Sequence, residues 1–354
     1  DLVVFNGAGE QERIDFPDDE GEVLGELERI LTIEALAEEP WEPVGWSKCN
    51  VCWFFDYCWP RARDGKALGY VLDIDLPFVR RLRDEGIETY PELAAKFDVN
   101  ALADLKSPSS KGKKDRSIAP AERILENVQA LVAGEPLRRT TGEQKVPVDP
   151  RILEDDHYVM FDLEGVPPDL DDWDKIYLWG MQVFGTEKGE FRPAFAGFGE
   201  GGDEEGWIEF LRTARELLDQ YEGIHFVHWA SYEKTKTELY MDRYPNSDVE
   251  TGSEVLGRLV DLLPITRDAV ALPLPSYSLK VVEELPQLIE LTGFDRSGGD
   301  VKKGDDSIAA YMEAAETDDV SRREELMEQL AAYNQQDLEA TWAVQSWLRQ
   351  MADS

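Results

Sequence analysis

The chain has 354 residues, of which 42% are hydrophobic and 10% aromatic, so it can form two or three domains with buried cores. No stretch approaches the ~20 apolar residues of a membrane span, and no leader resembles a signal peptide. We therefore expect neither a membrane protein nor a secreted one, and we place the protein in the cytoplasm. Because the first residue is Asp1 rather than Met, we also expect a fragment of a longer protein.

Acidic residues dominate the charge: 74 Asp and Glu stand against 37 Lys and Arg, a formal net charge of −37. The acids are spread over the whole length, which is typical of a halophilic surface whose self-repulsion is screened by high salt. A polyanion ordinarily avoids nucleic acid, because binding releases counterions from phosphates onto basic groups. On a halophilic surface, however, net charge says little about the ligand, and the positions of the few cations matter more.

The N-terminal elements are short. Residues 2–16 predict two strands joined by a turn, and residues 21–38 have helical periodicity. The stretch 75–97 predicts two helices separated by a glycine, the second begun by a capping box of Thr89 and Glu92.

The pattern becomes α/β after residues 134–155, which combine Gly, Pro and charge without periodicity and which we interpret as a linker. Three strands in a meander, followed by alternating helices and strands, predict a mixed sheet with helices on both faces. The expected strands are 157–165, 175–185, 190–199, 224–230 and 259–263, and the expected helices are 204–221, 232–243, 278–285 and 321–351.

Asp162 and Glu164 form the strongest local signal, in the strand sequence FDLEG. Positions i and i+2 of a strand face the same side, so the two carboxylates project together. Such a pair at the end of a buried strand is costly unless cations neutralise it, and its hard oxygens favour Mg²⁺ or Mn²⁺. The alternative is two solvated acids on an edge strand.

The final predicted helix carries a second pair, Tyr333 and Asp337, which share one face because they are four residues apart. A phenol beside a metal-binding carboxylate can orient or help deprotonate an attacking water. An ordinary amphipathic helix is the alternative. A third motif, HWASYE, places Glu233 at the start of a helix, where an acid is tolerated in any case, and His228 is more often packed than a ligand.

Taken in chain order, these motifs resemble those of the DEDD exonucleases of the ribonuclease-H-like superfamily. More closely, the stretch 157–348 is similar to the ribonuclease-H-like domain that ends a family of predicted RecB-like nucleases. FDLEG, HWASYE and YNQQDLEAT match its motifs I, II and III, and VDLL followed by PLPSYSLK fits its "DL … YSLK" segment.

The resemblance implies two divalent ions, Mg²⁺ or Mn²⁺. Asp162, Glu164 and Asp337 would hold one ion. Asp162 would bridge to the second, which Glu233 would hold through water.

It also implies that Tyr333 orients the nucleophilic water and that Lys280 contacts a phosphate. One departure weakens the expectation of full activity. The family's motif II acid is Asp with an Asn several residues before it, whereas Glu233 and His228 stand at those positions here.

The three cysteines, Cys49, Cys52 and Cys58, fall within ten residues, which argues against a disulfide framework and for a reducing compartment or a metal. Their spacing resembles the C-terminal part of the iron–sulfur staple of RecB-family nucleases, whose fourth cysteine lies far upstream. The resemblance implies a [4Fe–4S] cluster in the full-length protein that is incomplete in this chain. The alternative is three buried thiols among neighbouring aromatic side chains.

The stretch 75–97 resembles a helix-hairpin-helix, which offers backbone amides to a phosphate, although a plain helical spacer fits equally well. No Gly-x4-Gly-Lys-Ser/Thr loop occurs, so the chain supplies no helicase motor, and any helicase or repair partner is unidentified. The best cationic patches for nucleic acid comprise Lys111, Lys113, Lys114, Arg116, Arg138 and Arg139.

We therefore expect an α/β protein in three parts: a remnant of a PD-(D/E)XK nuclease domain with the cysteine staple (1–70), a helical, helix-hairpin-helix-like region (71–133) and, after the linker (134–155), a ribonuclease-H-like mixed sheet flanked by helices (156–354). The resemblance implies a 3′–5′ exonuclease that acts by a two-metal mechanism on single-stranded or frayed DNA, with DNA favoured over RNA. The rival is a catalytically inactive ribonuclease-H-like scaffold that binds nucleic acid within a larger RecB-like DNA-repair protein.

Overall fold

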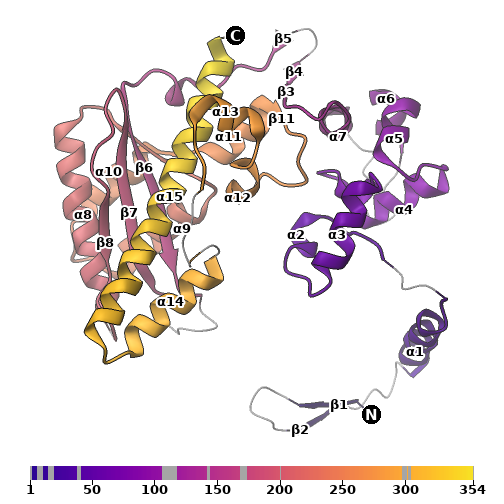
Figure 1. Cartoon of the computed structure of the whole chain (residues 1–354), viewed down its shortest axis with the longest axis horizontal. Helices are drawn as coiled ribbons and strands as arrows, with labels where there is room; N and C mark the ends of the chain where they lie inside the picture. Colours follow the sequence, from indigo (N-terminus) through magenta and orange to yellow (C-terminus); the bar gives the residue numbers. More distant parts are fainter. Residues whose placement is uncertain are drawn as a thin grey trace.

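A helical N-terminal part and a C-terminal part built on a sheet make up the chain (Figure 1). The computed structural model describes residues 2–5, 11–14, 20–37, 41–105, 118–141, 144–167, 174–199, 201–296, 301 and 304–353. None of the helices in these ranges is both long enough and apolar enough to cross a membrane.

A five-stranded mixed sheet organises the C-terminal part, as the sequence predicted. Its strand order is β10-β9-β6-β7-β8, with β6 in the centre. β6 pairs antiparallel with β7 and parallel with β9, while β7–β8 is antiparallel and β9–β10 is parallel. The strands are β6 (His157–Gly165), β7 (Ile176–Gly185), β8 (Arg192–Phe195), β9 (His225–His228) and β10 (Leu259–Asp261).

Helices cover both faces of this sheet, and each face has its own apolar core. Val159, Phe161 and Leu163 of β6 pack with α8, α9 and α10 on one face. Tyr158 and Met160 pack with α11, α12, α13 and α15 on the other. The helices are α8 (Gly202–Gln220), α9 (Tyr232–Arg243), α10 (Val249–Arg258), α11 (Leu262–Ala269), α12 (Leu279–Val282), α13 (Pro286–Thr292), α14 (Gly304–Glu316) and α15 (Val320–Asp353). Of these, α10, α11, α13 and α14 had no counterpart in the sequence prediction.

The N-terminal part begins with an antiparallel hairpin of β1 (Leu2–Phe5) and β2 (Gln11–Ile14), as predicted. The next helix, α1 (Glu20–Glu34), keeps its apolar side chains exposed, so nothing among the described residues covers them. The remaining elements are α2 (Trp46–Cys49), α3 (Phe55–Asp64), η1 (Leu68–Tyr70), α4 (Leu76–Asp84), α5 (Tyr90–Lys96), α6 (Val99–Asp104) and α7 (Ile118–Ala133).

The predicted pair of helices at 75–97 is confirmed as α4 and α5. Gly86 connects them with φ 78°, a left-handed conformation that costs glycine little. Thr89 and Glu92 form the expected capping box, in which the backbone N–H of Thr89 donates to Glu92 Oε2 at 3.0 Å. These helices share an apolar core with α6 and α7. Whether they act as a helix-hairpin-helix, and whether the N-terminal region derives from a PD-(D/E)XK domain, stay predictions.

The stretch 134–155, which we interpreted as a linker, contributes short strands to the C-terminal part. β3 (Leu137–Arg138) pairs antiparallel with β11 (Val270–Ala271). Two further strands, β4 (Thr140–Thr141) and β5 (Gln144–Lys145), pair with each other, and η2 (Pro150–Ile152) precedes β6.

Arg139 joins the two parts of the chain. Its guanidinium donates to Glu126 at 2.5 Å and Asn127 at 2.6 Å on α7, and to the carbonyl of Arg267 at 2.7 Å on α11. Only 4% of this residue is exposed. Its assignment to a cationic surface patch was therefore wrong. The guanidinium is buried, and Glu126 and the carbonyl of Arg267 accept its hydrogen bonds.

Candidate metal centre

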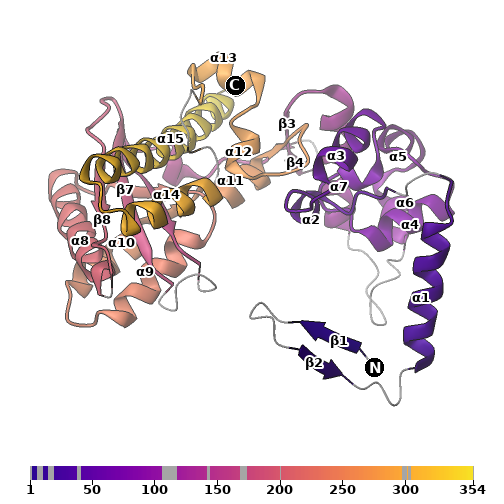
Figure 2. The same cartoon turned by 60° about the horizontal axis from the view of Figure 1, so that its bottom comes forward.

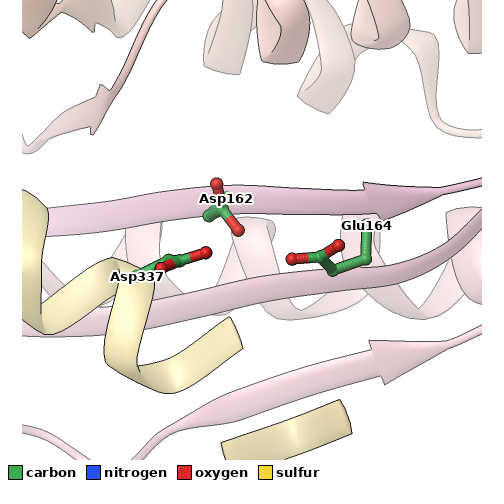
Figure 3. A group of neighbouring side chains, drawn as sticks. All are labelled: Asp162, Glu164 and Asp337. Carbon is green, nitrogen blue, oxygen red and sulfur yellow. The ribbon is translucent and has the colours of Figure 1, made fainter. Parts of the chain in front are cut away.

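Three carboxylates from distant parts of the chain converge on one face of the sheet. Asp162 and Glu164 project from β6, and Asp337 projects towards them from α15 (Figure 3). One oxygen of each carboxylate lies within 4.8 Å of the others. No other set of three His, Cys, Asp or Glu side chains in the described ranges meets that distance.

The strand pleat explains why the two β6 acids face α15. Phe161 and Leu163 point into the core beneath α8. Because side chains alternate along a strand, Asp162 and Glu164 must lie on the opposite face. Because they are two residues apart, the acids are neighbours on that face of the strand. Helix α15 crosses the same face.

Asn334 positions Asp162, and the sequence analysis assigned it no role. Its Nδ2 donates to Asp162 Oδ2 at 2.7 Å, and the residue is fully buried. Gly180 of β7 lies opposite Asp162 in the sheet, and a Cβ there would stand 1.7 Å from Asn334 Oδ1. A glycine at 180 is thus required for Asn334 to reach its partner. The one available signal was the helical spacing, since Asn334 lies three residues before Asp337.

Glu164 lies near two hydroxyl groups, Ser307 Oγ at 3.3 Å and Tyr177 Oη at 3.5 Å from Oε2. Those two hydroxyls are themselves 2.6 Å apart. Burial, and secondly the charge of Asp337, raise the pKa of Glu164 to about 8. Neutral hydroxyl donors therefore compensate its charge only in part.

The ionised form of Asp162 is disfavoured in the same way. Burial raises its pKa well above the ordinary value, and the negative charges of Asp337, Glu164 and Glu233 raise it further. Within the described part of the chain, neither Asp162 nor Glu164 forms an ion pair with a cation. Crowded, desolvated carboxylates with hard oxygen atoms suit a divalent cation such as Mg²⁺ or Mn²⁺, so this donor set fits the metal that the sequence predicted.

Asp337, by contrast, already contacts two cations. Its Oδ1 accepts a close hydrogen bond from Lys280 Nζ and another from Arg296 Nη2 at 2.5 Å. Arg296 is held in turn by Glu283, whose two oxygens lie 2.5 and 2.7 Å from the guanidinium. Sequence reasoning singled out Lys280 but missed Arg296, which stands in no recognisable motif and lies 41 residues from Asp337.

Tyr333 is buried beside this cluster, one helical turn before Asp337. Burial raises the pKa of its phenol above the ordinary value, and the charges of Asp337 and Glu164 add to that rise. Lys280 Nζ stands 4.3 Å from the centre of its ring, a cation–π contact. Tyr333 therefore remains a neutral phenol next to the acids, and its role in orienting water stays a prediction.

Glu233 lies outside the three-carboxylate cluster. Its Oε2 is 3.1 Å from His228 Nδ1, and both residues are almost fully buried. Burial raises the pKa of Glu233, while the hydrogen bond from His228 works in the opposite direction. The charge of Glu233 raises the pKa of Asp162, but the side chain that Glu233 contacts is His228. That Glu233 holds a second ion therefore stays a prediction.

A further acid, Asp261, stands near Glu233 at the end of β10 and was not singled out from the sequence. Its Oδ1 accepts hydrogen bonds from the backbone N–H groups of Leu263 and Ala230, both at 3.0 Å. Ala230 has φ 72°, an uncommon conformation for a residue with a side chain. Asp261 therefore secures the strained turn between β9 and α9 that carries Glu233.

The cysteines form no comparable group among the residues that the structure describes. Cys49 is buried, Cys58 is partly buried and Cys52 is exposed. Burial raises the pKa of the Cys58 thiol, and the charges of the other two cysteines raise it further. The alternative interpretation, that all three cysteines are buried thiols, is wrong because Cys52 is exposed. The iron–sulfur cluster stays a prediction.

The predicted nucleic-acid contacts Lys113, Lys114 and Arg116 lie outside the described residues. Lys280, the fourth, lies at the acidic cluster, with about a third of its side chain exposed.

Residues 159–349 match a family model described as the RNase_H superfamily. This match covers more than half of the chain and includes all three clustered carboxylates. Neither the curated proteins nor the solved structures contain a match.

Proposed function

The chain belongs to the RNase H superfamily, and on that basis we propose that it is a metal-dependent nuclease. The observation that carries this proposal is the convergence of Asp162, Glu164 and Asp337 within 4.8 Å inside the matched region. The finer proposal is a 3′–5′ exonuclease of the DEDD type, related to RecB-like nucleases, that acts on single-stranded or frayed DNA. That finer part rests on the order of the three motifs.

Asp162, Glu164 and Asp337 would hold the first Mg²⁺ or Mn²⁺ ion, and Glu233 would hold a second through water. Bound ions of this kind activate water and stabilise the charge that develops on a phosphodiester. Asn334 fixes the orientation of Asp162 through its 2.7 Å hydrogen bond. That support preserves the site's geometry before any ligand arrives, which reduces the cost of assembling it.

Lys280 and Tyr333 would act on the substrate side of the cluster. Lys280 is partly exposed, so its ammonium can reach a phosphate oxygen while it still contacts Asp337. Tyr333 is held by packing and by the cation above its ring, and its neutral hydroxyl would orient the attacking water. Arg296 is anchored by Glu283 and would keep Asp337 aligned.

One observation favours the rival function, a catalytically inactive scaffold that binds nucleic acid. Glu233 is buried, its Oε2 lies 3.1 Å from His228 Nδ1, and it is not a member of the three-carboxylate cluster. If Glu233 contributes no ligand when metal is present, the second ion would lack its proposed carboxylate and the two-metal reaction would be impaired.

Cleavage of single strands labelled at the 3′ or the 5′ end tests the proposal. The assay contains Mn²⁺ and high KCl, since the chain carries a net charge of −37. We expect the wild type to shorten strands from the 3′ end and Asp162→Asn to lose this activity. Glu222→Gln makes the same charge change at an exposed position beyond the other end of β6, and should retain activity. A folded wild type that binds Mn²⁺ but cuts neither strand would favour the scaffold.

A further inference from the structure

A groove of about 1040 Å³ runs between the two parts of the chain and ends at the acidic cluster. One wall comes from residues 44–50 and 71–77 of the N-terminal part, which include α2. The other comes from the turn after β9 and residues 275–280, which lead into α12. In both Figure 1 and Figure 2, α2 lies on the side of the N-terminal part that faces α12. Asp162 and Asp337 line the groove where it meets the sheet.

Cations in this groove stand out on so acidic a chain. Lys48 on α2, Arg267 on α11 and Lys280 on α12 all line it, and Lys48 is exposed. Two of the acids that line the N-terminal wall are already engaged. Asp75 accepts the backbone N–H of Phe78 as the cap of α4, and Asp73 accepts a hydrogen bond from Arg267 at 3.2 Å. Arg267 and Lys280 contact the lining acids Asp73 and Asp337, and the exposed Lys48 offers a positive charge to an anion on the N-terminal wall.

Aromatic side chains also line the groove. Trp229 lines the groove and is partly buried, and its indole N–H donates to the carbonyl of Tyr277 at 3.1 Å, which fixes the ring. On the opposite wall, Trp46 is held edge-on against Phe55 and Trp59, with ring centroids 5.4 Å apart in each pair. Fixed aromatic rings in a groove that also carries cations are the features that bind unpaired bases, because every base has a face that stacks.

The two walls are held together by hydrogen bonds rather than by chain connectivity alone. Arg139 contacts α7 on one side and α11 on the other. Arg123 on α7 donates to Asp268 on α11 at 2.7 Å, and Arg267 spans the groove to Asp73. Charge-assisted bonds, of which those of Arg139 are buried and the other two exposed, therefore connect the two parts of the chain beside the groove.

We propose that residues 44–50 and 71–77 form the second wall of a groove that binds an unpaired strand of nucleic acid and directs its end to Asp162 and Asp337. Phosphates contact Lys48, Arg267 and Lys280, and bases stack near Trp229. The destination of the strand rests on the proposed nuclease function, whereas the binding itself requires no catalysis. We expect a double helix to bind this groove more weakly, because its paired bases cannot stack on the aromatic side chains.

Lys48→Glu tests the N-terminal wall, because Lys48 is exposed and belongs to neither the sheet nor the acidic cluster. The probe is a fluorescein-labelled twelve-residue oligothymidylate, measured by anisotropy in EDTA so that no cleavage occurs. We expect about tenfold weaker binding and a salt slope reduced by about one, as for the loss of a phosphate contact. Lys66→Glu is the matched control, since Lys66 is exposed in the same segment but does not line the groove. Equal affinity of the two variants would overturn the proposal.

A second substrate separates this proposal from the nuclease function. Bis(p-nitrophenyl) phosphate with Mn²⁺ reports on the acidic cluster without a strand to bind. We expect the wild type and Lys66→Glu to hydrolyse it at equal rates and Asp162→Asn to leave it intact. A wild type that binds the oligothymidylate but does not hydrolyse the diester would refute the nuclease proposal and support the groove. Tighter binding of a twelve-base-pair duplex than of the single strand would overturn the groove.

Discussion

The acidic cluster and the cysteine segment are both candidate metal sites, yet the chain builds them in opposite ways. Asp337 is 173 residues from Glu164, and a central strand and a long helix bring them together over a large core. The cysteines lie within ten residues, Cys49 and Cys58 on two short helices and Cys52 between them, and their exposure ranges from buried to open. Among the described residues, rigid elements packed from distant segments bring three ligand atoms within 4.8 Å of one another, whereas closeness in sequence does not.

Metal binding should separate the two regions most clearly. At a Mn²⁺ concentration of 100 times Kd, an ion that binds only the folded state stabilises it by about 2.7 kcal/mol. We expect this gain in urea unfolding of the wild type and of Cys52→Ser, and its loss in Asp162→Asn. If Cys52→Ser loses the stabilisation by Mn²⁺ while Asp162→Asn keeps it, the ion binds at the cysteine segment and not at the acidic cluster.

Asn334→Ala should weaken Mn²⁺ binding by about 10- to 100-fold, because residues that orient metal ligands typically contribute that much. It should also lower the free energy of unfolding by about 1–3 kcal/mol, since Asp162 loses the hydrogen bond from Nδ2 of the buried Asn334. Isothermal titration with Mn²⁺, beside urea unfolding without metal, gives both values. Unchanged affinity would mean that Asp162 needs no support.

Gly180→Ala should lower the free energy of unfolding by about 1–3 kcal/mol, as overpacking does in a close-packed core. The added methyl group would meet Asn334 Oδ1 at 1.7 Å, and β7 and α15 have no room to separate. Gly257→Ala on α10 is the control, because nothing lies within 4 Å of its new methyl group. A helical glycine replaced by alanine should if anything gain stability. Equal stability of the two variants would contradict the packing of Asn334 against β7.

Cys52→Ser should change the free energy of unfolding by less than about 0.5 kcal/mol, as is usual for an exposed side chain. Cys49→Ser should cost more, since Cys49 is buried beside Trp59 and a hydroxyl there replaces an apolar contact. Chemical denaturation of the metal-free protein measures both. Equal losses would show that the cysteines act as one site.

Local patterns predicted much of the fold and part of the site. The alternation along β6 placed Asp162 and Glu164 on one face, and the capping box of Thr89 and Glu92 marked the start of α5. The spacing of Tyr333 and Asp337 put them on one side of α15. Each of these follows from the geometry of a single strand or helix, which a short stretch of sequence determines.

Contacts between distant elements were beyond such patterns. Arg296 reaches Asp337, and Glu233 turns to His228, because of how α12, α13 and α15 pack over the sheet and how the turn after β9 is strained. Arg139 looks like a surface cation in sequence but is buried at the joint. Burial decides whether a charged side chain can contact a ligand or is paired inside the protein. Burial in turn depends on how all the elements pack.

The sequence by itself determined which faces of β6 and α15 carry carboxylates, because side-chain direction repeats every two residues in a strand and every 3.6 in a helix. Only the tertiary structure decided that these faces meet, that Gly180 leaves room for Asn334 between them, and that residues 44–50 and 71–77 form one wall of a groove beside them. Those outcomes depend on how many separate elements pack around two cores, and no local spacing encodes that arrangement.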